Sequence, residues 1–308
     1  MRHGHINKKS EITVRVFGYP NSKTERRLCI EWNIVADSGC DLRGIKLGDK
    51  KIKITKIPFS IFVENIEYMD NPRFNVGDML HRIEKQDIHT HTACPSPAAW
   101  KEAFDQGDHI FAITLSSKVS GSYNSAQVAA AMVQEEDPEK KIHILDSGSA
   151  GPGPSLLAIR AAELMEEGVS FADAVMELED YKQKIHTMYG LSSFNNLIKN
   201  GRVSKVAGFV AGKLGLCGIG EASPQGEILV QGKVRGSGKM LAAFLERMEE
   251  LDFQGGKVLI SHCENQTLAK KLKEMILKQW PQAEILIMPA AGVCSYYVER
   301  KGLIVGFD

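Results

Sequence analysis

A loop crowded with hydroxyls, residues 115–122, holds the residue types that point most directly to chemistry. It contains four serines and one cation, and no histidine, aspartate or glutamate: Ser116, Ser117, Ser120, Ser122 and Lys118. An apolar β-type run precedes the loop and an Ala/Val-rich segment follows it, which predicts that the loop ends at a helix N-terminus. Amides there lack partners within the helix and carry partial positive charge. The loop is therefore suited to holding a carboxylate or phosphate.

The same order of a β-type run followed by small polar residues occurs twice more. Residues 34–36 lead into Asp37–Asp41, and residues 142–145 lead into Asp146–Gly151. Parallel α/β sheets place such loops along one carboxyl edge, where ligands bind. Each loop alone is also explained as a turn or a helix cap. Taken together, the three loops favour a ligand site.

The order of expected elements predicts an α/β protein with two domains. We expect residues 33–168 to form a mostly parallel sheet with helices on both faces, and residues 169–308 a second α/β domain, with a ligand between them. Residues 1–32 are expected to be an arm. Helices are predicted at 76–85, 97–106 and 155–167, a loop at 68–75, and extended or turn geometry at 90–97.

Composition excludes several classes of protein. The 308 residues are 43% hydrophobic and 25% charged, and 38 basic residues balance 38 acidic ones, which argues against a large nucleic-acid footprint. No apolar run approaches the ~20 residues of a membrane span, and the N-terminus lacks the apolar segment of a secretory signal. Six cysteines without CxxC spacing fit a reduced compartment. We therefore expect a cytoplasmic protein.

Three further patterns carry less weight. His89 and His91 form an HxH pair without a complete ligand set, so no metal is expected. The stretch 232–239 departs from a phosphate-binding loop in its spacing and has Met240 where Ser or Thr is required, which favours a basic loop that opens a helix. Asp37 and Asp146 are either an acid–base pair or, as we favour, acceptors for loop amides.

Several motifs together resemble one family. The sequence carries DSGCDL at 37–42, TACPSP at 92–97, a serine-rich signature at 115–126, and LIKNGRVS at 197–204. In order and type they are similar to the motifs of the DegV family of bacterial fatty-acid-binding proteins. The resemblance covers roughly residues 33–308.

The resemblance implies a non-catalytic protein that holds one long-chain fatty acid between its domains and needs no other cofactor. It implies that the carboxylate is bound by the hydroxyls of Thr92 and Ser120 and by the Gly121 amide. Some members present the acid to a fatty-acid kinase, which makes an acyl phosphate for phospholipid synthesis. Arg202 either pairs with the head group, docks an acidic partner or caps the preceding helix. Peripheral membrane contact is not indicated.

This sequence departs from the family pattern at several positions. Ala93 stands where the family usually has Ser, and Asn200 where it has Gly. Many members have a His-bearing loop near the C-terminus, where this chain has residues 292–297 instead. We expect Ser295 or Tyr296 to replace that histidine.

Two alternatives to a lipid carrier stay open. One is a hydrolase or phosphotransferase that uses Ser117 or Ser120 as nucleophile, although no histidine lies in a convincing loop to serve as its base. The other is a regulatory protein that senses a lipid.

Overall fold

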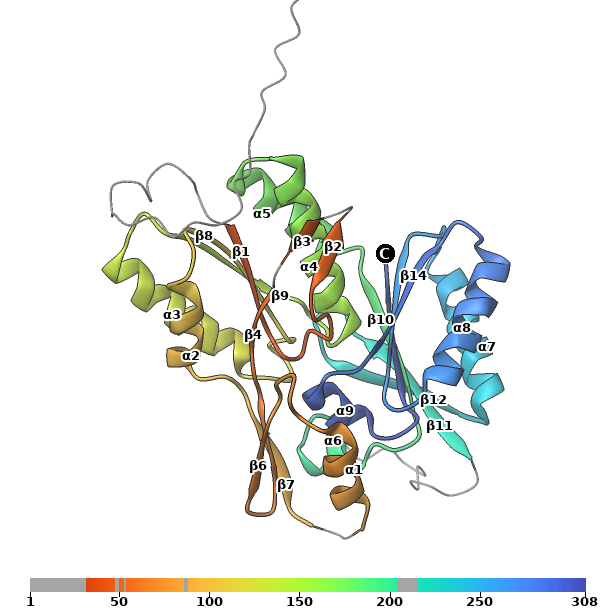
Figure 1. Cartoon of the computed structure of the whole chain (residues 1–308). Helices are drawn as coiled ribbons and strands as arrows, with labels where there is room; N and C mark the ends of the chain where they lie inside the picture. Colours follow the sequence, from red (N-terminus) through yellow and green to blue (C-terminus); the bar gives the residue numbers. More distant parts are fainter. Residues whose placement is uncertain (1–31, 48–49, 53, 86–87, 204–214) are drawn as a thin grey trace, which may run out of the picture. The chain divides into compact units, whose positions relative to one another are not determined.

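The computed structural model describes residues 32–47, 50–52, 54–85, 88–203 and 215–308 (Figure 1). The expected arm, residues 1–32, lies outside these ranges apart from Trp32, which begins the first strand. Ser204 of the LIKNGRVS motif also lies outside them. All that follows concerns the described residues.

The first sheet has four strands, and every pairing in it is parallel. Its order is β4-β1-β8-β9, built from β1 (Trp32–Asp37), β4 (Ile54–Ile57), β8 (His109–Thr114) and β9 (Lys141–Asp146). All six residues of β8 are buried, as expected of a central strand that is covered on both faces. The three polar loops of the sequence follow β1, β8 and β9, so they meet at one edge of this sheet.

Helices cover both faces of the first sheet, as the sequence predicted. They are α2 (Pro97–Phe104) and α3 (Ser122–Glu136) on one face, and α4 (Pro152–Glu167) and α5 (Phe171–Lys182) on the other (Figure 1). Successive strand residues point to opposite faces. Accordingly, Val35 packs in the core of α2 and α3, whereas Ile34 and Ala36 pack in the core of α4 and α5.

Local signals explain where the helices begin and end. Ser96 caps α2 by accepting a hydrogen bond from the Ala99 amide at 3.3 Å, and Pro97 occupies the first turn. Helix α4 ends at Gly168, whose φ of 71° suits glycine. It begins at Pro152 rather than at the expected Ser155.

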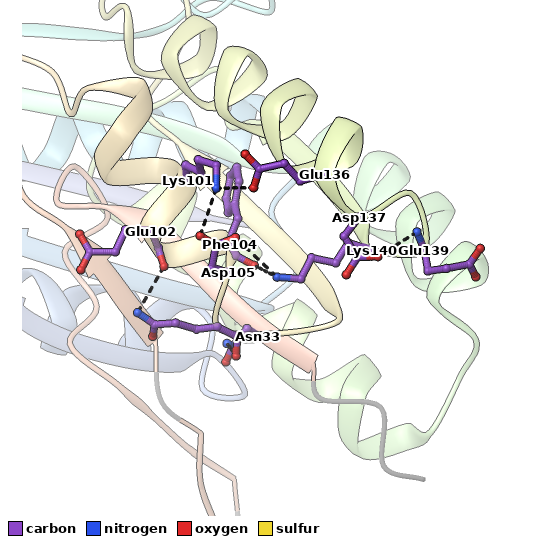
Figure 2. Close-up of polar contacts among 10 residues, drawn as sticks. Asn33, Lys101, Glu102, Phe104, Asp105, Glu136, Asp137, Glu139 and Lys140 are labelled. Carbon is purple, nitrogen blue, oxygen red and sulfur yellow. Dashed lines mark hydrogen bonds and ion pairs between the residues drawn. The ribbon is translucent and has the colours of Figure 1, made fainter. Parts of the chain in front are cut away.

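A group of ion pairs and hydrogen bonds joins the C-terminal ends of helices α2 and α3 (Figure 2). Lys101 Nζ lies 2.8 Å from Glu136 Oε2 and 3.4 Å from Asp105 Oδ2, and Lys140 Nζ donates to the Phe104 carbonyl at 2.9 Å. Such exposed pairs contribute little each, and buried residues such as Trp100 supply most of the packing. The packing fixes where both helices begin, beside the loops of the candidate site.

A small antiparallel sheet lies in the first half of the chain. Its order is β6-β5-β7, from β5 (Ser60–Val63), β6 (Ile66–Met69) and β7 (Thr90–Ala93), and α1 (Val76–Lys85) follows β6. The prediction of loop at 68–75 was wrong for its first two residues. Of the extended and turn geometries predicted for 90–97, residues 90–93 have the extended one, as a paired strand. Pairing with β5 supplies the hydrogen bonds that the local sequence does not indicate. A two-stranded pair, β2 (Ile45–Leu47) and β3 (Lys50–Ile52), completes this half.

The second sheet has six strands in the order β12-β11-β10-β15-β13-β14. Its strands are β10 (His186–Leu191), β11 (Leu216–Ala222), β12 (Ile228–Arg235), β13 (Lys257–His262), β14 (Glu284–Pro289) and β15 (Leu303–Phe307). Within it β13 and β14 pair in parallel, and the other pairings are antiparallel. The sequence did not predict β11. It also did not predict that residues 232–235 extend β12, which leaves no phosphate-binding loop there.

Four helices accompany the second sheet: α6 (Asn195–Lys199), α7 (Ser237–Glu250), α8 (Gln266–Gln279) and α9 (Gly292–Val298). Helices α7 and α8 pack on one face of the sheet (Figure 1). Helix α4 contacts strands of both sheets, so the site can draw residues from both halves of the chain. None of the helices in the described part of the chain is both long and apolar enough to span a membrane.

Candidate ligand-binding site

A cavity of about 340 Å³ lies where the polar edge of the first sheet meets the second sheet. This volume falls within the range of small-molecule pockets, roughly 300–1,000 Å³. Its walls come from the loops after β7, β8 and β9, from strands β10, β12 and β15, and from helices α6 and α9. The cavity is thus built by segments from both halves of the chain.

Most of the cavity wall is apolar. The apolar side chains come from six or more separate elements: Phe59, Leu115, Leu191, Leu197, Ile228, Val293, Val298 and Ile304. Seven of these side chains belong to a single hydrophobic cluster with α9 and the small sheet, and Ile228 packs against it. A wall of this kind favours a hydrocarbon ligand over a sugar or a nucleotide.

The cavity wall also carries a polar cluster that includes all four residues predicted to bind the head group. Thr92, Ser120, Gly121 and Arg202 all line the cavity. The Thr92 hydroxyl lies 2.8 Å from the hydroxyl of Tyr297, and the Arg202 guanidinium lies 6.0 Å from the centre of the Tyr297 ring. Arg202 Nε in turn donates to the carbonyl of Val119, the residue before Ser120, at 3.2 Å. These contacts join the cluster into one unit.

Within the serine loop, the structure separates structural hydroxyls from available ones. Ser116 Oγ donates to the Gly226 carbonyl and Ser122 Oγ donates to Asp37 Oδ2, each at 2.6 Å. Ser120 Oγ accepts from the Ser122 amide at 3.2 Å, which leaves its own proton for a ligand. Among the described residues, the Gly121 amide at the start of α3 has no hydrogen-bond partner. Ser120 and Gly121 together can therefore donate to an anion.

The two aspartates of the loops are amide acceptors, as we favoured. Asp37 Oδ2 also accepts from the Leu115 amide at 2.9 Å, and Asp37 Oδ1 accepts from Gly39 at 3.0 Å. Asp146 Oδ1 accepts from the amides of Ser117 and Gly148, each at 3.0 Å. These bonds hold the serine loop in place from both sides.

Burial gives the Asp37 carboxyl unusual electrostatics. The side chain is fully buried, which raises its pKa from 3.8 to about 6, and the hydrogen bond from Ser122 opposes that rise. Lys56, which donates to the Cys40 carbonyl, lowers the pKa to a smaller extent. Asp37 therefore couples the geometry of the serine loop to pH.

The expected substitute for the family histidine was wrong. Ser295 is buried and its hydroxyl donates to the Ala290 carbonyl. The Tyr296 hydroxyl is engaged by Thr90 at 2.6 Å and by the amide of Asn200 at 2.8 Å. Neither residue lines the cavity, whereas Tyr297 does.

Tyr297 lies on α9, a helix that the sequence analysis did not predict. In α9, Val293 and Tyr297 are four residues apart, as are Cys294 and Val298, and all four line the cavity. Residues at this spacing share one helix face. A prediction of a helix at 292–298 would have placed Tyr297, and neither Ser295 nor Tyr296, beside Val293.

Arg202 has one of its three predicted roles in the structure, that of a helix cap, while pairing with the head group and docking of an acidic partner stay predictions. Its Nη1 donates to the carbonyl of Asn200 at 2.5 Å, and Asn200 follows the last residue of α6. It therefore caps the preceding helix while its guanidinium also lines the cavity. The planar guanidinium group caps the helix and lines the cavity at the same time, which a lysine ammonium would not do.

The described residues contain no group of three or more His, Cys, Asp or Glu side chains arranged to hold a metal ion. In the same residues, no hydrogen bond joins a histidine to Ser117 or Ser120. His143 instead pairs with Glu179, and His262 accepts from the Asn265 amide. The arrangement offers hydrogen-bond donors to an anion rather than an activated nucleophile.

Fold and site together define, in the described residues, an α/β protein with a mostly apolar cavity whose wall includes a cluster of hydrogen-bond donors. The profile of the family described as "Uncharacterised protein, DegV family" matches residues 31–307. The chain belongs to the DegV family. A DegV domain-containing protein of Streptococcus gordonii is 36% identical over 277 residues, which cover 90% of this chain and 99% of the relative.

Two solved structures have the same fold and carry fatty acids. One is a DegV family protein from Eubacterium eligens loaded with heptadecanoic acid, 36% identical with a TM-score of 0.86. The other is the Streptococcus pneumoniae Fatty Acid Kinase (Fak) B3 protein loaded with linoleic acid, 34% identical with a TM-score of 0.86. Each match covers 90% of this chain and 99% of the other.

Proposed function

We propose that this protein binds one long-chain fatty acid in the cavity, with the carboxylate at the polar cluster and the hydrocarbon along the apolar wall. Thr92, Ser120 and the Gly121 amide donate to the carboxylate, with Tyr297 and Arg202 beside them. The ligand then lies between the two expected domains, residues 33–168 and 169–308. The observation that carries the proposal is a mostly apolar cavity whose wall includes a cluster of hydrogen-bond donors, Thr92, Ser120, Gly121 and Arg202.

The chemistry of a fatty acid fits the two parts of this cavity. Burial of hydrocarbon contributes about 0.8 kcal/mol per CH₂ group, or on the order of 10 kcal/mol for a sixteen-carbon chain before ordering costs. The carboxylate must keep hydrogen bonds when it is buried. Hydroxyls and amides supply these bonds without a closely paired countercharge, so the head group stays accessible to chemistry by a second protein.

We further propose that the protein presents the fatty acid to a fatty-acid kinase. The Streptococcus pneumoniae Fatty Acid Kinase (Fak) B3 protein supports this, since it is similar over nearly its whole length. Within the described ranges, no histidine is hydrogen-bonded to Ser117 or Ser120 as a base would be, which supports a carrier over the serine-hydrolase alternative. We expect p-nitrophenyl esters to stay intact after incubation with the purified protein. We also expect acyl phosphate to form only when a kinase is added.

The direct test is extraction of the purified protein under denaturing conditions, followed by mass spectrometry of the released lipid. Wild-type protein is expected to release fatty acid in near one-to-one amount. The double variant Thr92→Ala/Ser120→Ala should release far less, because two donors to the carboxylate are lost. Ser117→Ala is the matched control, since its hydroxyl is in the same loop but outside the cavity wall. Equal fatty acid in the double variant and wild type would refute the head-group assignment.

A further inference from the structure

Two buried carboxylates from the first half of the chain hold the start of α9. Asp41 Oδ1 accepts from the Ala291 amide at 2.7 Å. Asp70 Oδ1 accepts from the Gly292 amide at 2.7 Å, and its Oδ2 accepts from the Val293 amide at 2.8 Å. Asp41 is 3% exposed and Asp70 is 8% exposed. Three successive amides at this helix start are thus satisfied by the protein itself.

These attachments are directional and closely packed. Carboxylates at a helix N-terminus interact favourably with its amides and dipole, which offsets part of the cost of burying them. A methyl group added at Gly292 would lie 2.6 Å from Asp70 Oδ1 and 2.5 Å from the ring of Phe74. The α9 start therefore has no room to shift toward residues 70–74.

The position of α9 decides where the Tyr297 hydroxyl lies. Tyr297 is one helical turn after Val293, whose amide is bound by Asp70. The hydroxyl meets Thr92 at 2.8 Å, and hydrogen bonds weaken sharply when they lengthen by several tenths of an ångström. Loosening the start of α9 would therefore disturb the head-group end of the cavity.

We propose that Asp70, assisted by Asp41, is a positioning residue that seats α9 so that Tyr297 reaches the head group of the ligand. Through Tyr297 it sets the preference for a carboxylate over an uncharged head of the same chain length. The inference rests on the proposed function, because it assigns the carboxylate to the cluster that contains Thr92.

The test compares the affinities for hexadecanoic acid and hexadecanol in delipidated protein. Asp70→Asn keeps the side-chain shape but replaces one acceptor oxygen by a donor. We expect the preference for the acid to fall at least about tenfold, the effect of losing one hydrogen bond to a charged group. Tyr297→Phe should lower it similarly, and the double variant should lower it no further than either single variant.

A matched control separates positioning from stability. Asp308 also accepts from a backbone amide, that of Lys257 at 2.6 Å, and from a hydroxyl, that of Tyr181 at 2.5 Å, but it lies outside the cavity wall. Asp308→Asn should leave the acid preference unchanged even where it lowers the Tm. An Asp70→Asn protein with a lower Tm and an unchanged preference would overturn the inference.

A second measurement needs no ligand. The chain has seven tyrosines, so ¹⁹F NMR of fluorotyrosine-labelled protein is tractable, and Tyr297→Phe identifies the resonance of Tyr297. Asp70→Asn should shift that resonance, whereas Asp308→Asn should not. An unshifted resonance would overturn the positioning role alone. In the affinity measurement, wild-type protein that bound neither hexadecanoic acid nor hexadecanol would overturn the proposed function and the selectivity that rests on it.

Discussion

Protonation of Asp37 should make the stability of the ligand-free protein depend on pH in a predictable direction. Burial raises the pKa of this carboxyl from 3.8 to about 6, so the folded protein binds the proton more tightly than the unfolded chain. Stability from this group is therefore fully present below about pH 4 and is lost as the pH rises to about 6. A difference of about two pH units corresponds to about 3 kcal/mol.

The variant Asp37→Asn removes this titration. The carboxylate now accepts hydrogen bonds from the amides of Leu115 and Gly39 and from the hydroxyl of Ser122. The NH₂ group of asparagine would face one of these donors, which adds a fixed cost to the stability of the variant. That cost is the same at every pH. The stability advantage of wild type over the variant should therefore shrink by about 3 kcal/mol between pH 4 and pH 7.

The assay is denaturant unfolding followed by tryptophan fluorescence at pH 4, 5, 6 and 7, with delipidated wild-type and variant protein. Ser122→Ala is the companion variant, because it removes a hydrogen bond that lowers the Asp37 pKa and should move the pH-dependent range upward. A wild-type advantage that stays constant from pH 4 to pH 7, or that grows, would refute the reasoning.

Two further substitutions test the polar cluster. Tyr297→Phe should weaken binding of hexadecanoic acid about tenfold or more and that of hexadecanol much less, as measured by calorimetry, because only the acid gains a charge-assisted bond; equal losses for both lipids would contradict a head-group role. Arg202→Ala should lower the Tm, since the Val119 and Asn200 carbonyls lose their donor, and should also weaken binding of the acid and slow acyl-phosphate formation with a kinase. Arg202→Lys should restore neither in full, and normal lipid binding with normal acyl-phosphate formation in Arg202→Ala would leave the arginine a structural role only.

Much of the first half of the fold follows from local signals in the sequence. The β-type runs at 110–115 and 141–145 have polar loops after them, and Ser96 with Pro97 marks a helix start. These features depend on residues close together in the chain, so the parallel sheet and its polar edge could be predicted. The same local signals did not predict β11 and α9, and they left residues 90–93, which form β7, as either extended chain or a turn. Their short segments are stabilised by partners far away, such as β5 for β7.

The candidate site shows the same division. The serine loop, Asp37 and Asp146 were visible as types and spacings, and the resemblance indicated Thr92, Ser120, Gly121 and Arg202, which the fold brings to one cavity. The sequence could not show that Tyr297 rather than Tyr296 lines the cavity, because that depends on which face of α9 turns inward. The role of Asp70 was also hidden, since its partners are more than 200 residues away.

The sequence by itself determined the alternation of strands and helices, the hydroxyl-rich loop and the family, because each of these depends on neighbouring residues. Only the tertiary structure decided which hydroxyls remain available to a ligand and which tyrosine faces the cavity. The physical reason is that buried carboxylates accept hydrogen bonds from some hydroxyls and amides and not from others. Which ones they bond depends on distances between residues far apart in the sequence.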